Sequence, residues 1–325
     1  MATPAPEDNA PELPAALAAP LDAYLQQLRS QRKLSPLTVD AYARDLRELA
    51  VLAGAPAWDA IAHHDVRRFA AKLHGQGLGP RSIARKLSSW RGLFSWLAGQ
   101  GLLSANPVDG VRAPRAPKLL PKALSVEAAI HLVASVAPER AAEPDELCSR
   151  AMFELLYSSG LRVSELTGLD ASYQVPQGGK APLGWLDRAA GDVVVTGKGN
   201  KIRRVPVGSH ALAAIDAWLA VRPPARDGSN ALFLSSRASR VSPRLVQQRL
   251  ARHGAASGTA VKVHPHVLRH SFASHMLQSS GDLRAVQDML GHASITSTQV
   301  YTALDFQHLA AVYDQAHPRA KPKPG

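Results

Sequence analysis

Four short segments in the second half of the chain hold most of the residues that can bind anions, move protons or attack as nucleophiles. They are residues 159–166 with Arg162, the turn 197–200 with Lys198, residues 264–270 with His266 and Arg269, and residues 290–292 with His292, followed nine residues later by Tyr301. Arginine grips a phosphate through two parallel hydrogen bonds. Arg162 lies among core-like apolar residues, so its guanidinium must be paired or face a ligand.

The local context of these residues allows a shared role without requiring one. His266 and Arg269 are three residues apart and therefore lie on one face of the helix expected there. Lys198 stands between two glycines, which let the backbone approach another surface closely. Taken singly, each residue also has an ordinary explanation, Lys198 as a hairpin lysine and Tyr301 as a helix contact.

Several histidines near these segments raise the alternative of a metal site. They are His264, His266, His270, His275 and His292. Their spacing lacks the His-Glu-x-x-His pattern of helical zinc ligands, and Cys148 is far away in the sequence. Arg269 lies among them and would repel a cation. We therefore expect no metal site.

The charge of the chain indicates a polyanionic partner. Its 325 residues include 38 Lys and Arg against 26 Asp and Glu, a formal net charge of +12. This favours nucleic acid, although a basic protein without such a partner remains an alternative. No apolar run reaches the ~18–20 residues of a membrane span. The N-terminal residues lack a secretory signal, and the single cysteine excludes an internal disulfide, so we expect a cytoplasmic protein.

The first third of the chain predicts a small helical bundle. Residues 1–16 are rich in proline and alanine, and we expect them to be disordered. Residues 17–105 carry apolar residues at three- and four-residue spacing in four segments, the second of which begins at Ser35-Pro36 and ends near Gly54. The fourth segment carries basic residues on the opposite face, which we expect to contact DNA unless they form an ordinary solvated face. They are Arg81, Arg85, Lys86 and Arg91.

The rest of the chain predicts a linker and a mixed domain. Residues 106–121 contain prolines and basic residues without an apolar period, as in a domain linker. In residues 122–325 a hairpin is indicated over 193–207, and Gly160 is expected to end a helix. Residues 171–191 are irregular and receive no assignment. We expect a mainly α fold, with a four-helix N-terminal domain and a mostly helical α+β domain that holds a small antiparallel sheet.

Considered together, the four segments resemble the catalytic signature of the tyrosine recombinases, the phage integrase family. Its motifs are Gly-Leu-Arg-Val-Ser-Glu-Leu, Gly-Lys-Gly-Asn-Lys, His-Val-Leu-Arg-His-Ser-Phe-Ala-Ser-His, Leu-Gly-His and Tyr-Thr. The likeness begins at about Leu17 and implies a SAM-like core-binding domain followed by a catalytic domain. It assigns the catalytic positions to Arg162, Lys198, His266, Arg269, His292 and Tyr301, with Glu165 supporting them.

The resemblance implies strand exchange in DNA. Tyr301 would attack a phosphate held by Arg162 and Arg269. His266 would take the phenol proton, and Lys198 would protonate the departing 5′-oxygen. A 3′-phosphotyrosine bond conserves the energy of the ester, so no metal, ATP or other cofactor is implied. A type IB topoisomerase, a phage-type integrase and a non-catalytic DNA-binding factor remain as alternatives.

Residues 304–320 are most similar to the tail of one member of a bacterial recombinase pair that resolves chromosome dimers at cell division. This implies a second recombinase as partner, a heterotetramer with two copies of each protein and control by a septal DNA translocase. It also implies that the tail contacts the neighbouring protomer. The sequence does not give the DNA site, the order of strand cleavage or the strength of partner control.

Overall fold

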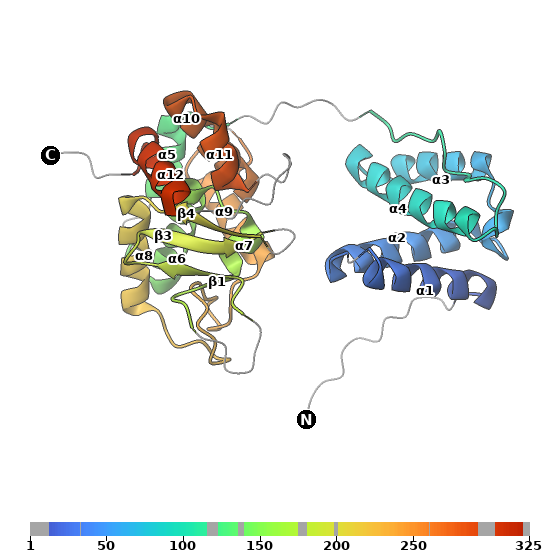
Figure 1. Ribbon diagram of the computed structural model, residues 1–325, viewed down its shortest axis with the longest axis horizontal. Helices are drawn as coiled ribbons and strands as arrows, with labels where there is room; N and C mark the ends of the chain where they lie inside the picture. Colours follow the sequence, from blue (N-terminus) through green and yellow to red (C-terminus); the bar gives the residue numbers. More distant parts are fainter. Residues whose placement is uncertain are drawn as a thin grey trace. The chain divides into compact units, whose positions relative to one another are not determined.

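The computed structural model describes residues 13–32, 34–115, 123–135, 140–174, 181–197, 201–259, 261–291 and 303–320. The chain forms two compact units, Met1–Leu119 and Leu120–Gly325, each with its own hydrophobic core (Figure 1). Within the described ranges, no helix is long and apolar enough to cross a membrane. The predicted fold class, mainly α with one small sheet, is confirmed.

The first unit is the predicted four-helix bundle. Its helices are α1 (Ala15–Ser30), α2 (Pro36–Ala53), α3 (His63–Gly75) and α4 (Pro80–Gly99), with a short 3-10 turn, η1 (Trp58–Ala60). The Ser35 hydroxyl accepts a hydrogen bond from the Thr38 amide at the start of α2. Gly54 ends this helix in the left-handed conformation, at φ +56°. These are the signals that predicted the second helix.

The beginning of the expected linker belongs to this bundle. Val108 and Val111 are buried in the core of the first unit. Their carbonyls accept hydrogen bonds from Nη2 of Arg91, at 3.4 and 3.1 Å. The side chain of Asn106 also bonds to the carbonyl of Arg91, at 3.1 Å. Residues 106–111 are therefore fixed to α4, and the rest of the linker is described only up to residue 115.

The second unit combines eight described helices with one four-stranded sheet. The helices are α5 (Val126–Ala134), α6 (Pro144–Ser159), α7 (Val163–Thr167), α8 (Ser209–Val221), α9 (Pro243–Ala256), α10 (Pro265–Ser280), α11 (Leu283–Leu290) and α12 (Ala303–Ala316). The strands are β1 (Leu169–Asp170), β2 (Gly184–Asp187), β3 (Asp192–Thr196) and β4 (Ile202–Pro206). They lie in the order β1-β2-β3-β4.

The sheet differs in two details from the sequence prediction. The β3–β4 hairpin is present as expected, but β1 pairs with β2 in parallel, so the sheet is mixed and not wholly antiparallel. The stretch 171–191, which received no assignment, contains β2. Strand β2 has only four residues, too few for the alternation of buried and exposed side chains to identify a strand in the sequence. Its conformation is determined by pairing with β3.

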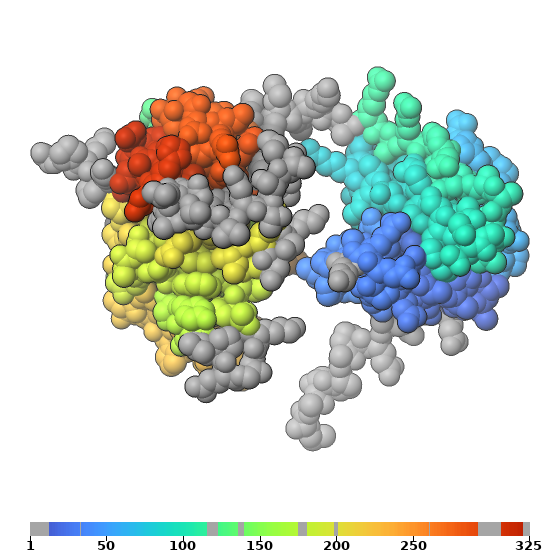
Figure 2. Space-filling view, in the orientation of Figure 1, coloured from blue at the N-terminus to red at the C-terminus, as the bar shows by residue number. Residues whose placement is uncertain are grey.

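Helix α6 forms the centre of the second unit. Every residue from Ala151 to Ser159 is buried, as expected of a helix enclosed on all sides. Helices α10, α11 and α12 gather beside the β4 edge of the sheet (Figure 1). In Figure 2 these C-terminal helices, in orange and red, form one continuous part of the surface of this unit. Of the candidate catalytic residues, Arg162 follows the end of α6, and His266 and Arg269 lie in the first two turns of α10.

Candidate active site

Arg162 occupies a sharp junction between two helices. Helix α6 ends at Gly160, whose φ is +56°, and α7 begins directly after Arg162. A Cβ at Gly160 would lie 2.4 Å from the ring of Phe272, so a larger residue cannot fit there. Glu165 fixes Arg162 twice, because its Oε2 accepts from the Arg162 amide and its Oε1 accepts from Nη1, both at 2.8 Å. The Arg162 side chain remains 35% exposed and can reach a ligand.

Arg269 projects from α10 toward the same junction. Its Nη1 donates to the carbonyl of Gly160 at 2.5 Å, and its Nη2 donates to the carbonyl of Leu290 at 2.7 Å. Burial and the nearby charge of Arg162 lower the pKa of Arg269 to about 10. The guanidinium is therefore still cationic at neutral pH, and its orientation is set by two backbone carbonyls.

The C-terminal end of α11 joins three arginines. The carbonyls of Met289, Leu290 and Gly291 accept, in turn, from Arg203 at 3.0 Å, Arg269 at 2.7 Å and Arg162 at 3.2 Å. Carbonyls at a helix C-terminus lack partners within the helix and carry partial negative charge, so they suit cations. Three guanidiniums from β4, α10 and the start of α7 are thereby gathered at one helix end.

Arg203 is the member of this group that the sequence interpretation missed. Its side chain is 5% exposed, and Nη1 and Nη2 donate to the two oxygens of Glu165 at 2.8 and 2.9 Å. Burial alone would raise the pKa of Glu165, but the hydrogen bonds from Arg203 and Arg162 hold it below its ordinary value. The alternation of inward and outward side chains along β4 could have identified it, because Arg203 and Val205 share the buried face of that strand.

The remaining expected catalytic residues are only partly described. His266 is exposed on the first turn of α10, one turn before Arg269, and its ring lies 6.1 Å from that of His264. Three further residues lie outside the described ranges: Lys198, His292 and Tyr301. Their described neighbours are Gly197, whose amide bonds to the carbonyl of Lys201 at 2.8 Å across the hairpin, Gly291 and the first residue of α12, Ala303.

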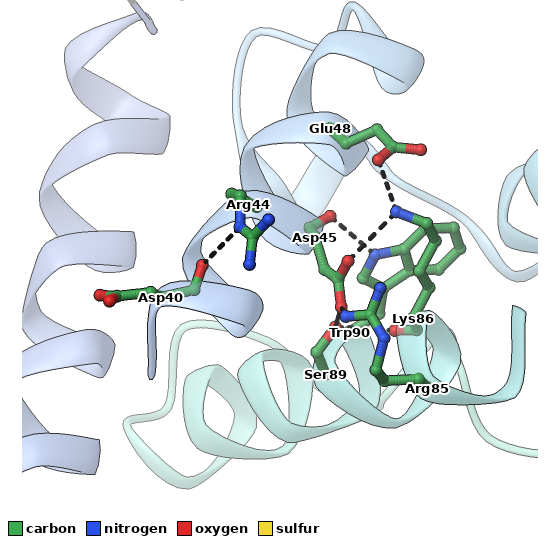
Figure 3. A network of polar contacts seen from close by, with 8 residues as sticks. All are labelled: Asp40, Arg44, Asp45, Glu48, Arg85, Lys86, Ser89 and Trp90. Atoms are coloured by element: carbon green, nitrogen blue, oxygen red, sulfur yellow. Dashed lines mark hydrogen bonds and ion pairs between the residues drawn. The ribbon is translucent and has the colours of Figure 1, made fainter. Parts of the chain in front are cut away.

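The basic residues expected to contact DNA from α4 do not share one solvated face. Lys86 is buried, and its ammonium pairs with Asp45 and Glu48 of α2 (Figure 3). The prediction that it faces solvent was therefore wrong. Successive residues of a helix point about 100° apart around its axis, so Lys86 reaches the interface with α2 while Arg85 stays exposed. Asp45 and Glu48 supply the charge that makes this burial possible.

The other three basic residues of α4 differ in how far they are engaged. Arg81 is exposed on the first turn of the helix. Arg85 pairs with Asp45 while its side chain remains 47% exposed (Figure 3). Arg91 is turned toward the backbone at Val108 and Val111. Of the predicted set, Arg81 and Arg85 present charge to solvent, and Arg91 does so in part, with 40% of its side chain exposed.

Helix α9 presents a polar face that the sequence interpretation did not single out. Its buried face carries Val246, Arg249 and Leu250. Its exposed residues include two arginines and two glutamines: Arg244, Gln247, Gln248 and Arg252. Arginine and glutamine are side chains that read base edges in the major groove. The other three residues follow Arg244 by three, four and eight positions, which places all four on one side of a helix, so the sequence could have identified this face.

Comparisons with known proteins agree with this architecture. Residues 127–308 match the phage integrase family, and residues 21–101 match the phage integrase N-terminal SAM-like domain. The fold is similar to that of a lambda integrase (75-356) dimer bound to a COC′ core site, with a TM-score of 0.64, 19% identity and coverage of 87% of this chain and 98% of that chain. The chain belongs to the phage integrase family of tyrosine recombinases and is a DNA recombinase.

Within this family the chain is similar to proteins named tyrosine recombinase XerC. It is 54% identical to tyrosine recombinase XerC 1 of Ralstonia nicotianae over 331 residues, covering 98% of this chain and 99% of the relative. It is 47% identical to tyrosine recombinase XerC of Pseudomonas aeruginosa over 310 residues, covering 94% of this chain and 96% of the relative. The expected XerC-like recombinase is confirmed.

Proposed function

We propose that this recombinase cuts and rejoins DNA through a 3′-phosphotyrosine intermediate formed at Tyr301. It acts in the cytoplasm with the partner recombinase XerD at dif-type sites, where the pair resolves chromosome dimers at cell division. The observation that carries the proposal is the convergence of Arg162 and Arg269 on adjacent carbonyls at the end of α11. His292 follows that helix end directly in the chain.

The two arginines supply the positive charge that phosphoryl transfer requires. Negative charge builds on the non-bridging oxygens, and cations fixed in advance stabilise it without reorganising. Arg269 and Arg162 are fixed by carbonyls, and Arg162 also by Glu165. Their charge replaces that of a divalent cation, so the reaction needs no metal. The 3′-phosphotyrosine bond conserves the energy of the ester, so the reaction needs no ATP. His292 adds a hydrogen bond to the same phosphate.

Proton transfer is assigned to two other side chains. A phenol has a pKa of about 10, so Tyr301 needs a base, and exposed His266 on α10 is the candidate. The departing 5′-oxygen needs an acid, for which we propose Lys198 in the hairpin turn after β3. The phenolate oxygen forms a bond to phosphorus as the bond to the 5′-oxygen breaks. Attack by another 5′-hydroxyl reverses these steps and releases the tyrosine.

Each unit contributes a surface for double-stranded DNA. In the first unit we assign this role to Arg81 and Arg85 of α4, and in the second to the exposed face of α9. Gln248 and Arg244 in that face carry the donors that bind adenine and guanine edges, whereas Arg81 is suited to phosphate. Base reading is thereby assigned to α9 and nonspecific affinity to both units.

The partners follow from the likeness to XerC. We propose a heterotetramer with two copies of this chain and two of XerD on paired dif-type sites, under control of the septal DNA translocase FtsK. Full recombination then requires XerD, whereas a topoisomerase would act alone. Efficient recombination by this protein without a second recombinase would contradict this assignment.

A nicked suicide duplex that bears a dif-like site tests the chemistry. Cleavage next to the nick releases a short oligonucleotide, so the covalent complex cannot be religated and accumulates. We expect an SDS-stable adduct on Tyr301, identified by peptide mapping, and none with Tyr301→Phe, which still binds the duplex. An adduct formed by the phenylalanine variant would show that another residue is the nucleophile.

A further inference from the structure

Arg203 is a buried cation whose hydrogen-bonding groups all point into the protein. Its Nε donates to the carbonyl of Met289 at 3.0 Å, and Nη1 and Nη2 donate to Glu165 at 2.8 and 2.9 Å. With 5% of its side chain exposed, it has no surface for a substrate. A role in the reaction must therefore be exerted through the residues that it holds.

The first of these residues is Glu165, which Arg203 shares with Arg162. Oε1 of Glu165 accepts from Nη1 of both arginines, and Oε2 accepts from Nη2 of Arg203 and from the Arg162 amide. The parallel pair of bonds from Arg203 fixes the plane of the carboxylate. Nη1 of Arg162 donates to Oε1 of this carboxylate. The direction of the Arg162 guanidinium therefore depends on Arg203.

The second is the end of α11. Arg203 binds Met289, and a Cβ added at Gly291 would lie 3.1 Å from Nη1 of Arg203. Gly291 also has a φ of +64°, which side-chain-bearing residues rarely adopt. Glycine at this position thus permits both the turn and the close approach of Arg203. The turn leads directly to His292.

The third connection runs along the chain. Arg203 lies on β4, the strand that follows the hairpin turn, five residues after Lys198. Its side chain therefore joins this strand directly to both Glu165 and α11. Arg203 thus joins β4 to α7, which begins directly after Arg162, and to the end of α11.

We propose that Arg203 is a positioning residue for strand cleavage, a role that rests on the function proposed above. It orients Arg162 through Glu165 and fixes the α11 turn that precedes His292. Lysine cannot replace it, because an ammonium cannot hold both oxygens of Glu165 and the carbonyl of Met289 in one plane.

The test compares Arg203→Met and Arg203→Lys with Arg204→Met. Arg204 is the next residue of the same strand, is 42% exposed on the opposite face and bonds to Asp187 and Asp192. Single-turnover cleavage of the suicide duplex is measured at saturating DNA in the full chain. We expect both Arg203 variants to cleave about 10²-fold more slowly with little change in DNA affinity, and Arg204→Met to stay within about threefold of the wild type.

A second substrate separates positioning from general destabilisation. A methylphosphonate at the scissile position removes one negative charge, so cleavage depends less on the direction of Arg162. The defect of Arg203→Met should shrink to about tenfold or less on this substrate. Equal slowing on both substrates, or a rate like that of Arg204→Met on ordinary DNA, would overturn the assignment.

A third measurement needs no catalysis. Amide hydrogen exchange in residues 283–291 should accelerate in Arg203→Met and remain unchanged in Arg204→Met, since only the former releases Met289. Unchanged exchange there would also overturn the proposal. A wild-type chain that forms no covalent complex would contradict the proposed function instead, while the exchange result would still decide whether Arg203 fixes this turn.

Discussion

Arg319 and Glu154 form a buried ion pair that joins the segment after α12 to the central helix α6. Nε of Arg319 donates to Oε2 of Glu154 at 2.8 Å, Nη2 binds the other oxygen, and the two side chains are 9% and 1% exposed. Tyr313 of α12 bonds to Ser158 nearby, at 2.7 Å. The segment up to Ala320 is thus anchored in its own unit, and the expected contact of the tail with a neighbouring protomer stays a prediction.

Breaking this anchor should destabilise the catalytic unit strongly. Arg319→Met leaves the carboxylate of Glu154 buried without its partner, a change that costs about 3–5 kcal/mol. The free energy of unfolding, measured by urea denaturation, should fall accordingly. Arg140→Met is the control, because its pair with Glu143 is exposed and such pairs contribute little to stability. Equal losses in the two variants would indicate that the tail is not fixed in this way.

The buried histidine of the same segment should make the unit sensitive to acid. Burial lowers the pKa of His317 from 6.5 to about 3, despite its hydrogen bond to the carbonyl of Tyr157, at 3.3 Å. Below pH 6.5 the unfolded chain therefore binds a proton that the folded chain does not, so stability falls as the pH falls from 6.5 toward 3. Between pH 7.5 and 5.5 this amounts to about 1 kcal/mol.

The measurement is the difference in unfolding free energy between these two pH values. His317→Gln should lower the difference by roughly that amount, whatever its effect on stability at pH 7.5. His275 contributes a loss in the same direction, because burial lowers its pKa as well. An unchanged difference in the glutamine variant would show that His317 is not held neutral in the folded state.

The two basic residues Lys86 and Arg81 should respond to mutation in opposite ways. Lys86→Met breaks the pairs with Asp45 and Glu48 and should cost about 3 kcal/mol of stability. Arg81→Ala should leave stability nearly unchanged and lower the slope of log affinity against log salt by about one unit, as expected when one phosphate contact is lost. Thermal unfolding and DNA titrations at several salt concentrations measure the two effects. The reverse pattern would contradict the positions described for these side chains.

The contrast between these residues shows what the sequence could and could not predict. The four-helix unit, the hairpin and the helix ends at Gly54 and Gly160 follow local rules of periodicity and capping, and they were predicted correctly. Burial of Lys86 depends on Asp45, some forty residues away, and such long-range pairing leaves no local signal. For Arg203 the alternation of β4 indicates a buried side chain, but its partner Glu165 lies on another element and has no local signal.

Cleavage should survive removal of divalent cations. We propose that Arg162 and Arg269 carry the charge that metal ions supply in many nucleases. Formation of the covalent complex in excess EDTA should therefore match the rate in magnesium buffer. A loss of cleavage that added magnesium restores would contradict the proposed division of roles.

The role of Lys198 as the acid can be tested by changing the leaving group. A 5′-oxygen is a poor leaving group unless it is protonated, so Lys198→Ala should slow cleavage by roughly 10²–10⁴-fold. A 5′-phosphorothiolate places sulfur at this position, and a thiolate departs without a proton. The variant should therefore cleave the sulfur substrate at close to the wild-type rate. Equal slowing on both substrates would mean that Lys198 binds phosphate, and that His266 or a water molecule delivers the proton.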